Sequence, residues 1–130
     1  MTSKPAIAIV DDDDFARAGT GSLMRSLGYN IQTFSSAEAF LQSEVVGFDC
    51  LISDIQMPGM SGLDLQMALK SRAPHLPVIF LTAFPNDRSM AIALKQGARQ
   101  YLEKPCPPDD LCSCVAAVIE AATRRKSGDS

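Results

Sequence analysis

The chain has 130 residues, a formal net charge of -3 and a sequence pI near 5.0. Hydrophobic residues make up 46% of the chain and charged residues 21%, as in an average globular domain. This length and composition predict one folded domain and exclude an intrinsically disordered chain. The acidic balance argues against nucleic-acid contact by this segment, because proteins that hold a phosphate backbone usually present a basic face.

Neither a sulfur metal site nor a secretory signal is indicated. The four cysteines follow no zinc-site spacing, and His75 is the one histidine that could complete such a site. The N-terminal apolar run covers residues 6–10 only, which is too short for the core of a signal peptide or for a membrane span. We therefore expect a cytoplasmic protein with no membrane contact, whose cysteines stay reduced.

Apolar runs and capping residues alternate along the chain. The predicted strands are residues 6–10, 29–34, 48–53, 77–81 and 99–102. The predicted helices begin at the capping residues Asp13 or Asp14, Ser35, Ser61, Asn86 or Asp87, and Asp109 or Asp110. Glu38 follows Ser35 by three residues, which predicts a capping box, and Asp64 follows Ser61 at the same spacing.

Five strands that alternate with five helices indicate an α/β fold with an open parallel sheet and helices on both faces. Right-handed crossovers leave few arrangements, and we expect a single-domain flavodoxin-like (βα)5 sandwich with strand order 2-1-3-4-5. Residues 29–34 alternate in polarity and should form an exposed edge strand. Residues 1–125 are expected to make up the domain, and residues 126–130 a frayed tail or the start of a linker.

Polar residues follow the strands where each strand ends. The aspartates 11–14 follow the first strand, Asp54 the third, Thr82 the fourth and Lys104 the fifth. The carboxyl ends of parallel strands share one edge, where ligands bind in open α/β sheets. The first and third strands are neighbours in the expected order, so Asp54 should lie beside Asp11 and Asp12. Taken alone, Asp54 could equally be a turn residue that ends its strand.

Three carboxylates at one edge need a counter-charge, since two unit charges about 4 Å apart repel by roughly 4 kcal/mol at an effective dielectric near 20. Lys104 and a divalent cation would supply it. Mg²⁺ is the expected ion because it prefers hard oxygen ligands and bridges carboxylates to phosphate, and the backbone carbonyl of Gln56 could complete its protein ligands. A carboxylate beside such an ion can attack phosphorus, so Asp54 is the candidate reactive group, with Thr82 placed to donate to the new phosphoryl group.

Four motifs stand in order along the chain: Val-Asp-Asp after the first strand, S-D-I-Q-M-P-G-M-S-G around Asp54, L-T-A after the fourth strand and Y-L-E-K-P before the last helix. This ordered set resembles the receiver domain of two-component response regulators, over residues 5–122. The resemblance implies that Asp54 is the phosphoacceptor and Lys104 the lysine that pairs with the phosphate. It also implies that Asp11 and Asp12 are the acidic pair that binds the metal and that the backbone carbonyl of Gln56 is a further ligand. Thr82 would supply the switch hydroxyl, and Tyr101 would be the aromatic residue that rotates.

By this resemblance the chain is a switch controlled by phosphorylation and not an enzyme with its own substrate. A partner histidine kinase would phosphorylate Asp54 in the presence of Mg²⁺, and slow self-dephosphorylation would reset it. The added charge would draw Thr82 inward and let Tyr101 follow, which changes the surface of the fourth helix, fifth strand and fifth helix. That surface would contact a second receiver, an output domain or a target protein. The family pattern also implies a cis peptide bond between Lys104 and Pro105.

Two positions depart from the family pattern. Cys106-Pro107-Pro108 stands where a large apolar residue usually follows the Lys-Pro pair. Phe84 stands two residues after Thr82, where the family varies and often has a polar residue. We expect the bulky Phe84 to limit the access of water to phosphorylated Asp54 and so to slow its hydrolysis.

Other interpretations stay open at this point. A magnesium-dependent phosphatase of the haloacid dehalogenase type also has an Asp-x-Asp pattern after its first strand, which Asp11 with Asp13 or Asp12 with Asp14 would satisfy. Against it, the chain has no room for a cap domain and no acidic pair after the fourth strand. A pure interaction module that never takes phosphate is a third interpretation, and Tyr101 could be a strand residue with no switching role.

Overall fold

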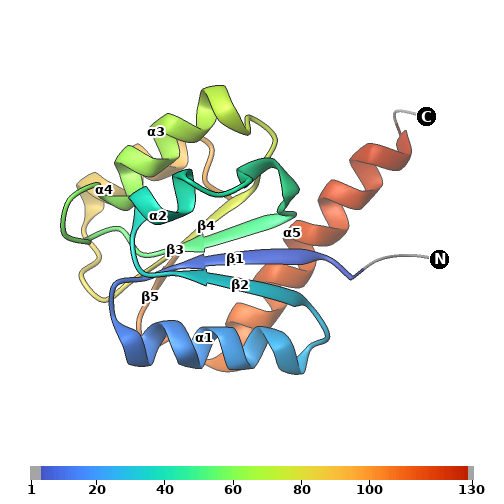
Figure 1. The fold of residues 1–130 in the computed structure, drawn as a ribbon, viewed down its shortest axis with the longest axis horizontal. Coiled ribbons are helices and arrows are strands. Elements are labelled where there is room, and N and C mark those ends of the chain that lie inside the picture. Colours follow the sequence, from blue (N-terminus) through green and yellow to red (C-terminus); the bar gives the residue numbers. More distant parts are fainter. Residues whose placement is uncertain (1–3, 129–130) are drawn as a thin grey trace.

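One five-stranded parallel sheet runs through the molecule, and a computed structural model describes the chain over residues 4–128. The strands lie in the order β2-β1-β3-β4-β5, as predicted (Figure 1). They are β1 (Ala6–Val10), β2 (Asn30–Phe34), β3 (Cys50–Ser53), β4 (Val78–Thr82) and β5 (Gln100–Glu103). The helices are α1 (Asp14–Ser26), α2 (Ala37–Leu41), α3 (Gly62–Arg72), α4 (Asp87–Lys95) and α5 (Pro108–Gly128), with a short 3₁₀ helix, η1 (Val45–Gly47), before β3.

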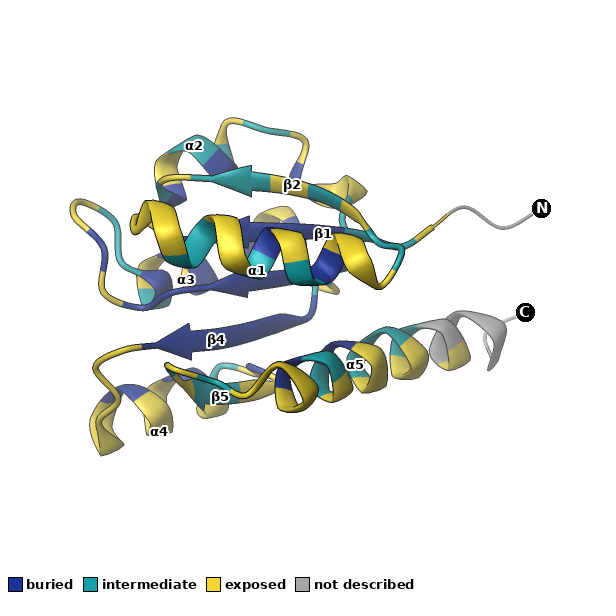
Figure 2. Ribbon diagram, turned by 90° about the horizontal axis from the view of Figure 1, so that it is seen from below, coloured by how far each residue is buried: buried dark blue, intermediate teal, exposed yellow. Residues whose placement is uncertain are grey.

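Helices cover both faces of this sheet. α1 and α5 pack on one face, whereas α2, α3 and α4 pack on the other (Figure 1). The central strands β1, β3 and β4 are almost entirely buried, and β2 and β5 at the two edges mix exposed and half-buried residues (Figure 2). The predicted exposed edge strand near residues 29–34 is therefore confirmed.

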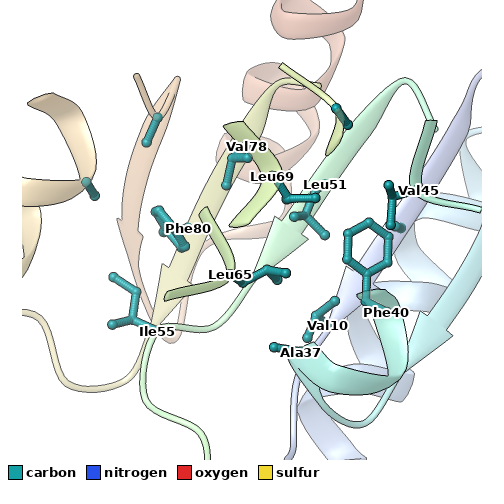
Figure 3. Packing of buried hydrophobic residues seen from close by; sticks show 14 of the residues in the cluster. Val10, Ala37, Phe40, Val45, Leu51, Ile55, Leu65, Leu69, Val78 and Phe80 are labelled. Carbon is teal, nitrogen blue, oxygen red and sulfur yellow. The ribbon is translucent and has the colours of Figure 1, made fainter. Parts of the chain in front are cut away.

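Alternate residues of each central strand belong to two different cores. On β1, Ile7 and Ile9 belong to the core under α1 and α5, while Ala8 and Val10 belong to the core under α2, α3 and α4. Figure 3 shows the second core, in which Phe40 from α2 is fully buried. A shift of β1 by one residue would exchange the two sets of side chains, so this packing fixes the register of the strand.

Capping residues set where three helices begin. Asp13 accepts from a first-turn amide at 2.9 Å to begin α1, and Asn86 accepts from one at 2.8 Å to begin α4. At α3 the hydroxyl of Ser61 accepts from the amide of Asp64 at 3.1 Å, and the carboxylate of Asp64 accepts from the amide of Ser61 at 3.2 Å. These three predicted helix starts are confirmed.

The predicted capping box at the start of α2 is wrong. α2 begins after Ser36, whose hydroxyl accepts from the amide of Ala39 at 3.0 Å, and not after Ser35. The carboxylate of Glu38 does not return to the cap, because it accepts from the amide of Met60, 22 residues away, at 3.0 Å. A contact between distant segments has replaced the local one.

Other boundaries also differ from the predicted ones, and β2, β4 and β5 are each displaced by one residue at one or both ends. β3 starts at Cys50 and not at residue 48, and the 3₁₀ helix η1 precedes it. α5 begins at Pro108, so Asp109 and Asp110 lie in its first turn, and the predicted start at one of these two caps is wrong. The helix extends to Gly128, so residues 126–128 of the expected tail belong to a helix, and residues 129–130 lie outside the described residues. Before this extension, Arg124 pairs with Glu120 one helical turn away.

Candidate functional site

Two buried aspartates lie side by side where β1 and β3 end. The two strands pair in parallel with Val10 opposite Ser53, so the next residues, Asp11 and Asp54, leave the sheet at the same point. The amide of Asp54 donates to the carbonyl of Val10 at 3.0 Å, which continues the ladder up to the site. Asp11 is 4% exposed and Asp54 8% exposed. The structure therefore brings these two aspartates together as the strand order predicted.

Asp12 adds a third carboxylate, and we call Asp11, Asp12 and Asp54 the acidic cluster. One carboxylate oxygen from each residue lies within 4.8 Å of the others, and Asp12 is exposed to solvent. Three carboxylates fit a hard divalent cation, and the exposed side leaves room for the water ligands that Mg²⁺ retains. The acidic cluster could therefore bind a metal ion. Gln56, the source of the predicted carbonyl ligand, lies two residues after Asp54 with its side chain exposed.

Lys104 supplies positive charge to this cluster. Its ammonium group donates to Asp11 at 2.7 Å and to Asp54 at 3.0 Å. Burial alone would lower the pKa of Lys104, but hydrogen bonds to the two aspartates and their negative charges raise this pKa above its ordinary value. The backbone amide of Lys104 donates to the carbonyl of Thr82 at 2.8 Å, so backbone pairing with β4 holds the lysine at this edge. The bond from Lys104 to Pro105 is cis, as the resemblance implied.

The loop after β3 folds back closely over Asp54. A Cβ atom at Gly62 would lie 2.2 Å from the backbone oxygen of Asp54, so a side chain there would push the loop away. Further along the loop, the amide of Met60 donates to Glu38 on α2 at 3.0 Å. The carboxylate of Asp54 also accepts from the amide of Ile55 at 2.6 Å. The loop is thus fixed at several points around the carboxylate.

Thr82 and Tyr101 make contacts outside the acidic cluster. Thr82 is fully buried, and its hydroxyl oxygen accepts from the amide of Phe84 at 3.1 Å. Tyr101 is half-buried, and its hydroxyl group lies 3.2 Å from the amide of Asn86 and 2.5 Å from the hydroxyl of Ser89. The structure therefore brings the three acids and the lysine together, whereas the hydroxyl group of Tyr101 contacts the start of α4.

The contacts of three further residues near the site were not predicted. Arg17 donates to the backbone carbonyl of Asp11 at 2.8 Å and pairs with Asp14 at 2.5 Å. The sequence did contain a signal for this pair, because residues three apart in a helix lie on the same face. Glu38 and Ser89 had no such signal, since each contacts a residue on another element.

Comparison with known proteins decides the family. The sequence profile of the response regulator receiver domain matches residues 7–116. The chain belongs to this receiver family. The receiver is 37% identical over 123 residues to the response regulator protein TodT of Pseudomonas putida, covering 93% of this chain and 54% of TodT. It is 34% identical over 123 residues to the transcriptional regulatory protein FixJ of Bradyrhizobium diazoefficiens, covering 94% of this chain and 60% of FixJ.

A solved structure supports the same assignment. The receiver matches a CheY-like response regulator receiver domain protein from Methanospirillum hungatei with a TM-score of 0.89 at 25% identity, covering 95% of this chain and 99% of that one. The receiver spans 54% of TodT and 60% of FixJ, so both relatives are considerably longer. The phosphatase alternative has no support in these comparisons. None of the helices between residues 4 and 128 combines the length and the hydropathy that a membrane span requires.

Proposed function

We propose that this receiver is a phosphorylation-controlled switch in which Asp54 takes a phosphoryl group from a phosphohistidine of a partner kinase. One observation carries the proposal: Lys104 bridges Asp11 and Asp54, both buried, at 2.7 Å and 3.0 Å. A nucleophilic carboxylate, neighbouring acids and an ammonium group at one sheet edge are the parts that phosphoryl transfer requires. Membership of the receiver family supports a histidine kinase as the donor, because receivers work with such kinases in two-component systems.

Transfer forms a bond between phosphorus and a carboxylate oxygen of Asp54, and it breaks the bond between phosphorus and the donor's histidine nitrogen. The amide of Ile55 holds one carboxylate oxygen at 2.6 Å, and Lys104 holds the other at 3.0 Å. The acceptor is therefore oriented before the donor arrives, which lowers the entropic part of the barrier. Lys104 already lies at this edge and shares the negative charge of the transferring oxygens.

Mg²⁺ is the ion that we assign to the acidic cluster, with the carbonyl of Gln56 as a further ligand. Lys104 balances one of the three carboxylate charges at this edge, so a divalent cation would balance the other two. When bound, Mg²⁺ neutralises charge on the phosphoryl oxygens. The exposed carboxylate of Asp12 is the ligand that remains accessible from solvent.

Thr82 and Tyr101 convert phosphorylation into a change of surface. Phosphorylation adds a charge of about -1.5 to -2, to which the hydroxyl of Thr82 can donate once it gives up its contact with Phe84. Tyr101 then moves, and the surface of α4, β5 and α5 changes. A second receiver, an output domain or a target protein binds this surface in one state. The chain has no separate substrate and loses phosphate slowly, and it acts in the cytoplasm. We assign residues 1–125 to the domain, and its last helix continues beyond this boundary to Gly128.

Phosphorylation by a small donor tests the assignment of Asp54. The receiver, incubated with acetyl phosphate and Mg²⁺, should gain one phosphoryl group by intact-protein mass spectrometry. Asp54→Asn should remove this gain, and chelation of Mg²⁺ should slow it about tenfold or more, because the phosphoryl charge is then less well balanced. Asp109→Asn, at an exposed acid in the first turn of α5, is the matched control and should behave as the wild type.

Mapping the modified residue separates this function from the alternatives. A phosphoryl group on Asp11 or Asp12 that survives Asp54→Asn would contradict the proposal. The absence of any modification with acetyl phosphate, and of any binding of beryllofluoride with Mg²⁺, would instead favour an interaction module that never takes phosphate.

A further inference from the structure

The hydroxyl group of Tyr101 lies in a small ring of hydrogen bonds at the start of α4. The amide of Asn86 lies 3.2 Å from the tyrosine oxygen, and the hydroxyl of Ser89 lies 2.5 Å from it. The same serine hydroxyl lies 3.2 Å from the backbone carbonyl of Asn86. The ring therefore joins β5 to the first turn of α4 through two side chains and one peptide unit.

One assignment of protons satisfies all three hydrogen bonds of the ring at once. An amide can only donate, so Tyr101 accepts from Asn86, and a carbonyl can only accept, so Ser89 donates to Asn86. Each hydroxyl has a single proton, and that of Ser89 is already used. The proton of Tyr101 therefore goes to the oxygen of Ser89. Ser89 is the acceptor that holds the tyrosine hydroxyl in this position.

Ser89 is a buried residue whose position is fixed by the helix cap. Ser89 is 8% exposed, and its amide donates to the Asn86 side chain at 2.8 Å as part of the helix cap. Its position relative to the helix start is thus fixed by the backbone. A hydroxyl group in this place keeps Tyr101 against the first turn of α4.

The ring is also connected to the acidic cluster along the chain. Thr82 accepts from the amide of Phe84 at 3.1 Å, and Asn86 follows Phe84 by two residues. A movement of Thr82 toward Asp54 that breaks this contact frees the segment before α4. Asn86 contributes both a donor and an acceptor to the ring, so a shift of this segment weakens the hold on Tyr101.

We infer that Ser89 is a positioning residue that latches Tyr101 in the unphosphorylated state and thereby sets how readily the receiver switches. The inference rests on the proposed function, since it assumes that Tyr101 changes position when Asp54 is phosphorylated. The latch stabilises one of two states. Removing it raises the fraction of receivers in the switched state before any phosphate arrives, and tighter binding of a phosphoryl analogue follows by linkage.

Tyrosine labelling gives a direct readout of the latch. The chain has two tyrosines, Tyr29 and Tyr101, so protein made with 3-fluorotyrosine gives two fluorine NMR signals that Tyr29→Phe assigns. In the wild type, beryllofluoride with Mg²⁺ should shift the Tyr101 signal. Ser89→Ala without beryllofluoride should move the Tyr101 signal part of the way toward that shifted position, while the Tyr29 signal stays in place.

Ser71→Ala is the matched control for this substitution. Ser71 on α3 also donates to the carbonyl three residues before it, at 3.3 Å, but it is exposed and far in sequence from any tyrosine. Its removal therefore deletes the same kind of helix contact without touching the ring. The Tyr101 signal and the affinity for beryllofluoride should both equal those of the wild type.

The affinity for beryllofluoride gives the second measurement. Ser89→Ala should bind it about threefold to tenfold more tightly than the wild type, the effect of losing one ordinary hydrogen bond from one of two states. Tyr101→Phe removes the same hydrogen bond from the other side, so Ser89→Ala should have little further effect in the Tyr101→Phe background.

The outcomes distinguish the latch from the switch itself. A wild-type Tyr101 signal that does not respond to beryllofluoride would overturn the proposed movement of Tyr101. A wild-type signal that responds, together with a Ser89→Ala receiver whose signal and affinity match the wild type, would overturn the latch alone. Tighter binding by Ser89→Ala that persists unchanged in the Tyr101→Phe background would also overturn it, because the serine would then act through another contact.

Discussion

At the scale of residues, one lysine side chain balances much of the negative charge at the sheet edge. Lys104 reaches Asp11 and Asp54 at once, so one ammonium group offsets much of the repulsion between two buried carboxylates. The sequence predicted which residues meet here, because each follows a strand. It did not predict that the lysine would bridge both acids, since this depends on the distance between β5 and the two central strands.

Phe84 gives a prediction at the same scale. Phe84 is 66% exposed, and its amide is bonded to the hydroxyl of Thr82, so its ring should move inward when Thr82 turns to the phosphoryl group. Phe84→Ala should then shorten the half-life of phosphorylated Asp54 by about threefold or more, because water reaches the acyl phosphate more easily. The loss of phosphate is followed by mass spectrometry after removal of the donor.

Val46→Ala serves as the control for Phe84→Ala. Val46 is 72% exposed in η1 and takes no part in the site. A half-life that is the same in Phe84→Ala, Val46→Ala and the wild type would show that the ring does not shield the phosphoryl group.

At the scale of elements, two pairs of a serine and an acid, Ser35 with Glu38 and Ser61 with Asp64, show when a local sequence pattern forms the predicted capping box. Ser61 and Asp64 form the capping box of α3, and among residues 4–128 the carboxylate of Asp64 bonds to no other element. Glu38, by contrast, bonds to the loop after β3, and Ser36 caps α2 in place of Ser35. Both pairs have the same spacing, so the difference arises from what lies beside each helix start.

The capping box of α3 can be tested by stability. Ser61→Ala removes the acceptor for the amide of Asp64, which should lower the free energy of unfolding by about 0.5–2 kcal/mol. Urea denaturation followed by circular dichroism measures the change. Ser113→Ala, at an exposed serine inside α5, should leave stability unchanged or raise it slightly, because alanine favours a helix more than serine does. Equal midpoints for Ser61→Ala and Ser113→Ala would mean that the cap does not stabilise the helix.

At the scale of the whole molecule, burial and ion pairing make stability depend on alkaline pH. Cys50 is fully buried, and burial together with the charge of Asp49 raises the pKa of its thiol from 9.0 to about 12. The pKa of Lys104 is raised as well. A group whose pKa is raised by folding stabilises the fold fully below its unfolded pKa and loses this effect as the pH rises toward the folded pKa.

The free energy of unfolding should therefore decrease as the pH rises above about 9. Ionisation of Cys50 contributes up to about 1.4 kcal/mol per pH unit to this decrease. Cys50→Ala and Cys50→Val should both show a shallower fall, because neither side chain ionises. Their stabilities at pH 7 differ, since only the alanine leaves a cavity. Urea titrations at a series of pH values measure the slopes. A slope in both variants equal to that of the wild type would contradict this assignment.

The sequence by itself determined the strand order and the edge at which Asp11, Asp54 and Lys104 gather. Alternating strands and helices leave few parallel topologies, and the residue that follows a strand always leaves at the same end. Only the tertiary structure decided that Glu38 bonds to the loop after β3 and that the hydroxyl of Ser89 contacts that of Tyr101. Such contacts join separate elements, and their geometry depends on how helices pack against the sheet, which local periodicity does not encode.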